Sequence, residues 1–258
     1  MHEKHEAVLI HDQLAGLFAE RYLRYKNDPY WDAFTYSRRK INQVLHGYLC
    51  YARAPLRVLD VGCGTGHFLK ELWERGFACS GCDPSDKMLT YARGLNPSIG
   101  FENAGIEHLP YKSDSFDIII AIEVMRYIRD VDRALSEVHR VLKPGGLCLV
   151  TYAPKFSTSL YPLLNILTSR VQLRKLSKVK QYFHSIGELG RLYKRGGFID
   201  MRIDARFWGP FIYVDRLYRP LASRMLRAWE PIDDRISDLP LLRNLSNLFV
   251  VAARKPGS

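Results

Sequence analysis

The sequence lacks the features of a membrane-spanning or disulfide-stabilised protein. It has no run of about 20 apolar residues free of charge, the length that a helix needs to cross a bilayer. Its first residues, MHEKHEAVLIHDQL, mix His, Glu and Asp into the apolar positions, unlike a secretory signal. The cysteines are odd in number and do not suggest a disulfide framework: Cys50, Cys63, Cys79, Cys82 and Cys148. We therefore expect a cytoplasmic protein with reduced thiols.

The sequence also lacks the residue clusters of a metal site. Cys79 and Cys82 have the C-x-x-C spacing of a ligand pair, but no second Cys or His pair follows at the spacing of a zinc site. In a strand, residues three apart point to opposite faces. We expect no bound metal.

Acidic residues are missing from a long stretch of the second half. Residues 1–150 hold 19 basic and 19 acidic side chains, whereas residues 151–258 hold 19 basic and 8 acidic ones, which accounts for the net charge of +11. No Asp or Glu lies between Glu137 and Glu188, a span that contains Arg170, Arg174, Lys175, Lys178 and Lys180. This imbalance suggests an anionic partner.

Repeats and Gly/Ser linkers are absent, and 258 residues with 47% hydrophobic content fit one α/β domain. Residues 5–22 and 36–50 carry apolar side chains at helical spacing and predict a helical cap over 1–55. Between 56 and 152, apolar strands such as RVLDV and FDIIIAI alternate with helices, which predicts a doubly wound, mostly parallel sheet. The alternation breaks over 153–184 and 209–243, which we interpret as two helical insertions near the C-terminal strands.

A glycine-rich loop follows the first predicted strand. In Asp60-Val61-Gly62-Cys63-Gly64-Thr65-Gly66, alternate glycines permit a close approach of a ligand to backbone N–H groups at a helix N-terminus. The Asp60 carboxylate suits a partner that carries an amine. Neither the Gly-Lys-Ser/Thr of a phosphate-binding loop nor the third glycine of a dinucleotide fingerprint, which would replace His67, is present. Asp83 ends the next strand, where a ribose diol would lie beside the loop.

Four ordered segments resemble the class I S-adenosylmethionine-dependent methyltransferases, in particular the ubiquinone/menaquinone-biosynthesis and small-molecule methyltransferase subgroup. They are LDVGCGTG, GCDPSDKML, HLPYKSDSFDIIIAIEV and EVHRVLKPGGLCLVT, and they cover about residues 57–152. The resemblance implies an α/β fold with a seven-stranded sheet whose last strand is antiparallel, and it implies S-adenosylmethionine as cofactor.

The resemblance also implies a set of cofactor-binding residues. The methionyl part would lie at Asp60, Gly62, Cys63, Gly64 and Gly66, the ribose at Asp83 and Pro84, and the adenine near Met88, with Glu123 on the floor of the site. Many relatives have an acidic residue where this sequence has Gly105, so the backbone of Gly105 and Ile106 would have to recognise the adenine. A catalytic base is needed only for a protic acceptor. The candidates are His67, Glu123, Tyr127 and His184.

The acceptor leaves more than one hypothesis open. Val214, Leu217, Leu221, Met225 and Trp229 can share a helical stripe surrounded by arginines, although Pro220 interrupts it. Such a segment suits either an anionic membrane surface or a lid that packs on the domain. We favour a small-molecule or lipid-linked acceptor. The alternatives are RNA bound by the basic C-terminal part, for which no RNA-binding motif is present, and a non-catalytic S-adenosylmethionine-binding module.

Overall fold

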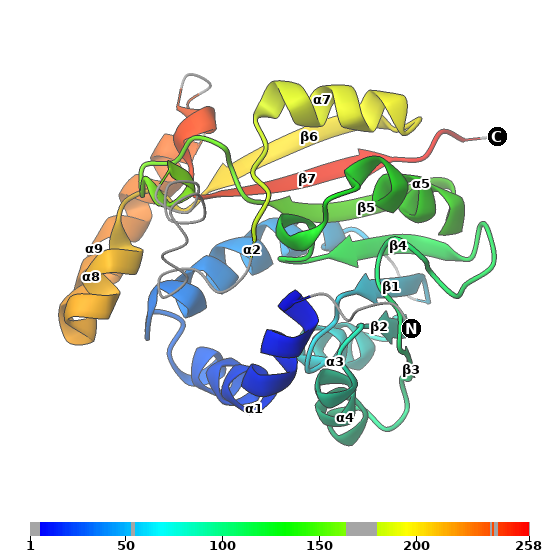
Figure 1. The fold of residues 1–258 in the computed structure, drawn as a ribbon, viewed down its shortest axis with the longest axis horizontal. Coiled ribbons are helices and arrows are strands. Elements are labelled where there is room, and N and C mark those ends of the chain that lie inside the picture. The colour runs from blue at the N-terminus through cyan, green and yellow to red at the C-terminus, as the bar shows by residue number, and fades with distance from the viewer. Residues whose placement is uncertain (1–5, 53–54, 164–179, 238, 240–241, 258) are drawn as a thin grey trace.

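A seven-stranded sheet with the order β3-β2-β1-β4-β5-β7-β6 forms the centre of the computed structural model, which describes residues 6–52, 55–163, 180–237, 239 and 242–257 (Figure 1). Strands β1 to β5 are parallel to one another, and β7 is antiparallel to both β5 and β6. The strands are β1 (Arg57–Val61), β2 (Ala78–Cys82), β3 (Gly100–Glu102), β4 (Phe116–Ala121), β5 (Leu142–Tyr152), β6 (Ile199–Arg206) and β7 (Leu248–Arg254). The expected doubly wound sheet with an antiparallel last strand is confirmed.

Helices cover both faces of this sheet (Figure 1). One face packs on α5 and α7, and the other packs on α2, α3 and α9. The helical elements are α1 (Glu6–Asn27), α2 (Ala33–Leu49), α3 (His67–Glu74), α4 (Asp86–Leu95), η1 (Met125–Tyr127), α5 (Val131–Val141), α7 (Ile186–Arg195), α8 (Phe211–Leu217), α9 (Arg219–Ser237) and η2 (Arg243–Leu245).

The apolar strand runs are explained by burial on both faces. In β4, Ile119 and Ala121 belong to the cluster under α5 and α7, whereas Ile118 and Ile120 belong to the cluster under α2 and α3. A central parallel strand therefore needs apolar side chains at consecutive positions. Since the strands end at one edge, the loops that follow β1, β2 and β4 meet there.

The boundaries of the first helices differ from the expected ones. The first helix continues to Asn27, and the second begins at Ala33 instead of residue 36. Asp32 caps it by accepting a hydrogen bond from the backbone N–H of Thr35 at 2.7 Å, while Thr35 Oγ1 accepts one from the Asp32 N–H at 2.9 Å. This capping box fixes the helix start three residues before the one that the apolar spacing predicted.

The apolar stripe expected over residues 211–229 is corrected by the structure. The helix is interrupted at Tyr218, two residues before Pro220. The segment therefore forms two helices, α8 and α9, that pack on each other. The face that α9 buries carries Ala222 and Leu226, and of the predicted stripe only Trp229 packs partly on this core, whereas Leu217, Leu221 and Met225 are exposed by 86%, 48% and 39%. None of the helices in the described parts of the chain is long and apolar enough to cross a membrane. The arginines and lysines at 170, 174, 175 and 178 lie outside the described residues.

Candidate functional site

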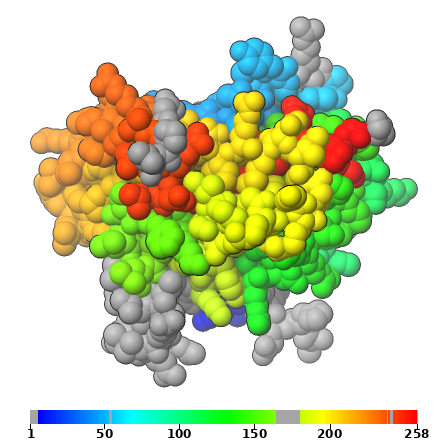
Figure 2. Space-filling view, turned by 90° about the horizontal axis from the view of Figure 1, so that it is seen from above, coloured from blue at the N-terminus to red at the C-terminus, as the bar shows by residue number. Residues whose placement is uncertain are grey.

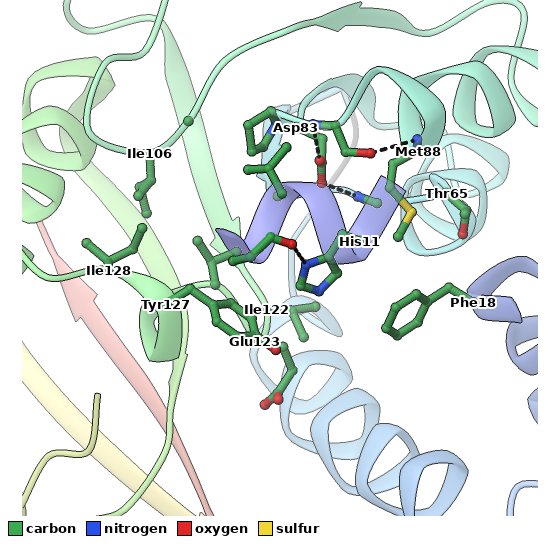
Figure 3. A pocket seen from close by; sticks show the side chains of 18 of the residues that line it. His11, Phe18, Thr65, Asp83, Met88, Ile106, Ile122, Glu123, Tyr127 and Ile128 are labelled. Carbon is green, nitrogen blue, oxygen red and sulfur yellow. Dashed lines mark hydrogen bonds between the residues drawn. The ribbon is translucent and has the colours of Figure 1, made fainter. Parts of the chain in front are cut away.

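A cavity of about 440 Å³ opens at the carboxyl ends of β1, β2 and β4, beneath α1 (Figure 3). Its walls come from the loops after these strands and from the two N-terminal helices. The lining residues are Ala7, Val8, His11, Phe18, Tyr22, Phe34, Ser37, Arg38, Ile41, Gly62, Gly64, Thr65, Asp83, Pro84, Ser85, Met88, Asn103, Gly105, Ile106, Glu107, Ile122, Glu123, Val124, Tyr127 and Ile128. Its size and its mixture of apolar walls with a few polar groups are typical of a small-molecule site.

The glycine-rich loop has a conformation that requires glycine. Gly62 has φ +70°, and a Cβ atom there would lie 2.3 Å from Cγ2 of Val124. The N–H groups of Gly62 and Cys63 donate to the Cys82 carbonyl at 2.7 and 3.0 Å, which ties the loop to the end of β2. Gly66, with φ +74°, packs on Ala92 of α4. The loop is therefore rigid and presents backbone to the cavity.

Asp60 is buried at the base of the loop without a hydrogen bond at one oxygen. Asp60 is 3% exposed, and its Oδ1 has no hydrogen-bond partner among the described residues. Burial raises the pKa of Asp60 to about 7, although the nearby Arg38 charge opposes this rise. Burying a carboxylate oxygen without a hydrogen-bond donor destabilises the folded protein. Binding of a ligand that supplies an N–H or O–H group at this oxygen would therefore be favourable.

Arg38 lies on the cavity wall formed by α2 and carries the complementary charge. It is 7% exposed, and its guanidinium lies over the rings of Tyr22 and Phe68 at 5.2 and 5.3 Å from their centroids. Among the described residues, no carboxylate forms an ion pair with it within 4.0 Å. Asp60 and Arg38 thus offer one negative and one positive group to a ligand beside the loop.

Asp83 is held in place by backbone donors. Its Oδ2 accepts from the Gly64 N–H at 2.9 Å, and its Oδ1 accepts from the Ser85 N–H at 2.9 Å. Burial raises the pKa of Asp83, while these two bonds lower it. Each carboxylate oxygen keeps acceptor capacity for a ligand hydroxyl. The adjoining wall is apolar, with Met88 and Ile106 buried.

The structure brings most of the predicted site residues together. Those that line the cavity are Gly62, Gly64, Asp83, Pro84, Met88, Gly105, Ile106, Glu123 and Tyr127. Asp60, Cys63 and Gly66 lie beneath or beside it without lining it. A Cβ atom at Gly105 would meet nothing within 4 Å, so this position is open and not sterically restricted to glycine.

Two of the predicted base candidates lie outside the cavity. His67 begins α3, where its Nδ1 is 2.9 Å from Thr65 Oγ1 and its ring stacks on Tyr22. Burial and the Arg38 charge lower the pKa of His67 to about 4. His184 forms a backbone bridge with Pro154 and packs on Tyr152, away from the glycine-rich loop.

The other two candidates face the cavity with their polar groups constrained. Glu123 has φ +61°, its N–H donates to Thr151 Oγ1 at 2.6 Å, and its carboxylate pairs with Arg126 at 2.8 Å. A non-glycine residue at positive φ is strained, which marks this position as one held by its surroundings. Burial raises the pKa of Tyr127, so its hydroxyl stays protonated.

The N-terminal helices contribute to the cavity in a way that the sequence did not predict. His11, Phe18 and Tyr22 of α1 and Phe34 and Arg38 of α2 all line the cavity. The spacing of 11, 18 and 22 places them on one helix face, which was the available signal. That face was interpreted as packing of a cap, because a single sequence does not distinguish a helix that packs on a core from one that closes a cavity.

Comparison with known proteins links this site to one domain family. A family model described as a methyltransferase domain matches residues 59–150. A ubiquinone/menaquinone biosynthesis C-methyltransferase UbiE from Campylobacter jejuni is 29% identical over 160 residues, which cover 58% of this chain and 64% of that protein. The chain spans less than two thirds of the length of the curated relatives it matches first.

Solved structures share the fold at low sequence identity. A possible histamine N-methyltransferase from Thermotoga maritima has a TM-score of 0.58 at 21% identity and covers 95% of this chain and 99% of its own. A phosphoethanolamine N-methyltransferase 2 from Haemonchus contortus, solved with S-adenosylhomocysteine, has a TM-score of 0.59 at 21% identity and covers 83% of this chain and 52% of its own.

Proposed function

We propose that this chain, whose residues 59–150 match the model of a methyltransferase domain, transfers a methyl group from S-adenosylmethionine to a small-molecule acceptor. One observation carries the proposal: Asp60 and Arg38 are buried beside the glycine-rich loop with opposite charges and unused bonding capacity. The amino-acid end of S-adenosylmethionine carries an ammonium and a carboxylate. In our proposal, Asp60 accepts from the ammonium, and the Arg38 guanidinium donates to the carboxylate.

The rest of the cavity suits the nucleoside part of the same molecule. The Asp83 carboxylate, held by Gly64 and Ser85, would accept hydrogen bonds from the ribose hydroxyls. Met88 and Ile106 would contact the adenine faces, with the backbone at Gly105 available to its polar edge. We expect the remaining loop residues to affect cofactor binding through the conformation of the loop. They are Gly62, Cys63 and Gly66.

The residues of this chain would contribute positioning and exclusion of water. The bound cofactor supplies an electrophilic methyl group on a sulfonium. The loop and Asp60 would hold its amino-acid end, Asp83 would hold its ribose, and the aromatic residues of α1 and α2 that line the cavity would exclude water. Because such a transfer needs alignment more than acid–base chemistry, the rigid loop would supply much of the catalysis.

Product analysis tests this function. The native protein incubated with S-adenosylmethionine and a panel of hydroxyl-, amine- and thiol-bearing small molecules is expected to form S-adenosylhomocysteine only when an acceptor is present. Mass spectrometry detects both products. Binding of the cofactor without turnover on any member of the panel would instead support the non-catalytic module.

Cofactor binding should depend on pH through Asp60. Since burial raises the pKa of this carboxyl to about 7, it is largely protonated at pH 6 and ionised at pH 8, and only the ionised form pairs with the ammonium. We expect the affinity for S-adenosylhomocysteine to be roughly tenfold higher at pH 8 than at pH 6. Calorimetry at both pH values measures this ratio, and an equal affinity at both would contradict the role of Asp60.

We further propose that the acceptor is lipid-linked or lies at an anionic membrane, and that the hairpin of α8 and α9 (residues 211–237) contacts that surface. The hairpin projects from the body in Figure 1 and forms one flank of the molecule in Figure 2. Its tip exposes Leu217 and Tyr218 by 86% and 62%, followed one turn later by Leu221 at 48%. Arg216 and Arg224 flank this apolar tip and pair with no carboxylate in the described chain. Apolar side chains between cations suit a bilayer with negative headgroups.

Vesicle sedimentation tests this contact. The native protein should sediment with vesicles of phosphatidylcholine and phosphatidylglycerol but not with pure phosphatidylcholine, and the double variant Leu217→Glu/Leu221→Glu should lose most of this binding. Tyr51→Glu, which changes a 90% exposed side chain after α2, is the matched control and should bind like the native protein. Salt-sensitive binding to RNA without binding to anionic vesicles would contradict the membrane proposal and favour RNA as partner.

A further inference from the structure

His11 lies inside the cavity, on the face of α1 that closes it (Figure 3). Its ring stacks on Phe18 with centroids 5.6 Å apart and meets the edge of Tyr127 at 5.2 Å. It also interacts electrostatically with Asp83, which lies beyond the end of β2. The imidazole is therefore fixed between the helix that covers the cavity and the loops that form its floor.

The hydrogen bonding of His11 decides which ring nitrogen is available. Nδ1 lies 2.6 Å from the carbonyl oxygen of Ala7, one turn earlier in the helix. A carbonyl oxygen can only accept, so Nδ1 must carry the hydrogen. In the neutral ring, Nε2 is then an unprotonated acceptor. Figure 3 shows this nitrogen on the side of the ring away from the Ala7 bond, toward the interior of the cavity.

Three other titratable side chains of the cavity, Glu123, Tyr127 and Asp83, are less suited to take a proton from an acceptor. The Glu123 carboxylate is paired with the Arg126 guanidinium at 2.8 Å. The Tyr127 hydroxyl stays protonated because burial raises its pKa. Asp83 already accepts two backbone hydrogen bonds and belongs to the cofactor part of the site.

We propose that His11 is the general base of this site and that the acceptor is a hydroxyl group on a planar ring. In the reaction, Nε2 of His11 takes the hydroxyl proton as the acceptor oxygen forms its bond to the methyl carbon. The carbon–sulfur bond of the donor breaks, and its electron pair stays on sulfur. The positive charge of the sulfonium is thereby replaced by that of the His11 imidazolium, which the Ala7 carbonyl stabilises. This inference rests on the proposed methyl-transfer function.

The walls around His11 favour a flat acceptor. Phe18 and Phe34 have centroids 5.9 Å apart, and Tyr22 meets Phe34 at 6.0 Å, so aromatic rings from both N-terminal helices enclose this part of the cavity. Planar rings pack on such faces and edges with favourable geometry. A ring hydroxyl also loses its proton more readily than an aliphatic one, which suits a neutral imidazole as base.

A chromogenic phenol tests the base independently of turnover. The protein saturated with S-adenosylhomocysteine is titrated with 4-nitrophenol, at a pH below the pKa of the free phenol, and absorbance reports the ionised fraction of the bound probe. The native protein should bind the probe mainly as the yellow phenolate. His11→Gln, which keeps a hydrogen-bond donor but cannot take the proton, should bind it as the colourless phenol. His46→Gln is the matched control, because His46 lies on α2 outside the cavity and is half exposed.

The outcomes are distinct. Equal ionised fractions in the native protein and in His11→Gln would overturn the assignment of the base. Failure of the native protein to bind 4-nitrophenol while it binds S-adenosylhomocysteine would overturn the acceptor class and leave the proposed function standing. A far-ultraviolet circular dichroism spectrum and an unfolding temperature like those of the native protein show that His11→Gln is folded. With a phenol that is methylated, the same variant should lose about a hundredfold or more in kcat.

Discussion

Asp60→Asn is expected to weaken the binding of S-adenosylhomocysteine by between about tenfold and a hundredfold, the loss typical of one hydrogen bond to a charged group. The substitution keeps the shape of the side chain and removes the negative charge beside the ligand ammonium. Since burial raises the pKa of Asp60 to about 7, its ionised form is unfavourable in the free protein. The variant should therefore unfold at a temperature no lower than that of the native protein, which separates lost binding from lost folding.

A truncated ligand provides the control for this prediction. 5′-Methylthioadenosine keeps the nucleoside and the sulfur but lacks the amino-acid end, so Asp60→Asn should leave its affinity unchanged. Asp83→Ala should weaken the binding of both ligands, because Asp83 is assigned to the ribose that they share. If Asp60→Asn lowered the affinity for both ligands by the same factor, Asp60 would support the loop and would not contact the ammonium.

Lys40→Met is expected to lower the free energy of unfolding by about 3–5 kcal/mol, as measured by urea denaturation. The Lys40 side chain is fully buried, and Nζ contacts Asp234 Oδ1 at 2.7 Å and Glu230 Oε1 at 3.1 Å, with Asp233 Oδ2 at 3.7 Å. Loss of the ammonium would remove the cation that three carboxylates of α9 share, so the buried Asp233 would lose its ion pair, whereas Glu230 would keep Arg39 at 2.8 Å. Because α2 also carries Arg38, the variant should lose cofactor affinity as well.

The matched control for this buried cluster is an ion pair at the surface. Arg195 pairs with Asp132 at 2.9 Å, but their side chains are 57% and 58% exposed. Exposed pairs contribute little, so Arg195→Gln should change the free energy of unfolding by less than about 1 kcal/mol. If Lys40→Met lowered the free energy of unfolding by no more than Arg195→Gln does, this result would contradict the structural role of the cluster.

The core of the fold could be predicted because its signals are local. The LDVGCGTG loop, the acidic residue that ends β2 and the apolar strand runs each fix a structural element within a few residues, and parallel pairing then brings them to one edge. Asp83 illustrates this: its place at the end of a strand predicts its approach to the loop, and the structure shows it accepting a hydrogen bond from Gly64.

The cavity wall formed by the N-terminal helices could not be predicted in the same way. Arg38 and Asp60 are brought together by packing of α2 on the sheet, which no local pattern encodes. The role of His11 depends on a hydrogen bond within its own helix and on the contact of its ring with Tyr127, so its sequence neighbours alone do not distinguish it from a surface histidine. In the hairpin of α8 and α9, one local signal was informative and the other was not. Pro220 marked the interruption between the two helices, whereas the helical periodicity of the apolar residues indicated the wrong buried face for α9.

Calorimetric titration of the native protein with S-adenosylmethionine at pH 8 tests whether this cavity binds the cofactor. The structure predicts one site per chain, since Arg38 and the Asp83 carboxylate line one cavity and Asp60 is buried at the base of the glycine-rich loop that borders it. We expect micromolar or tighter binding that S-adenosylhomocysteine competes away. Absence of binding at millimolar ligand would contradict the assignment of this cavity to the cofactor and, with it, the proposed methyl transfer.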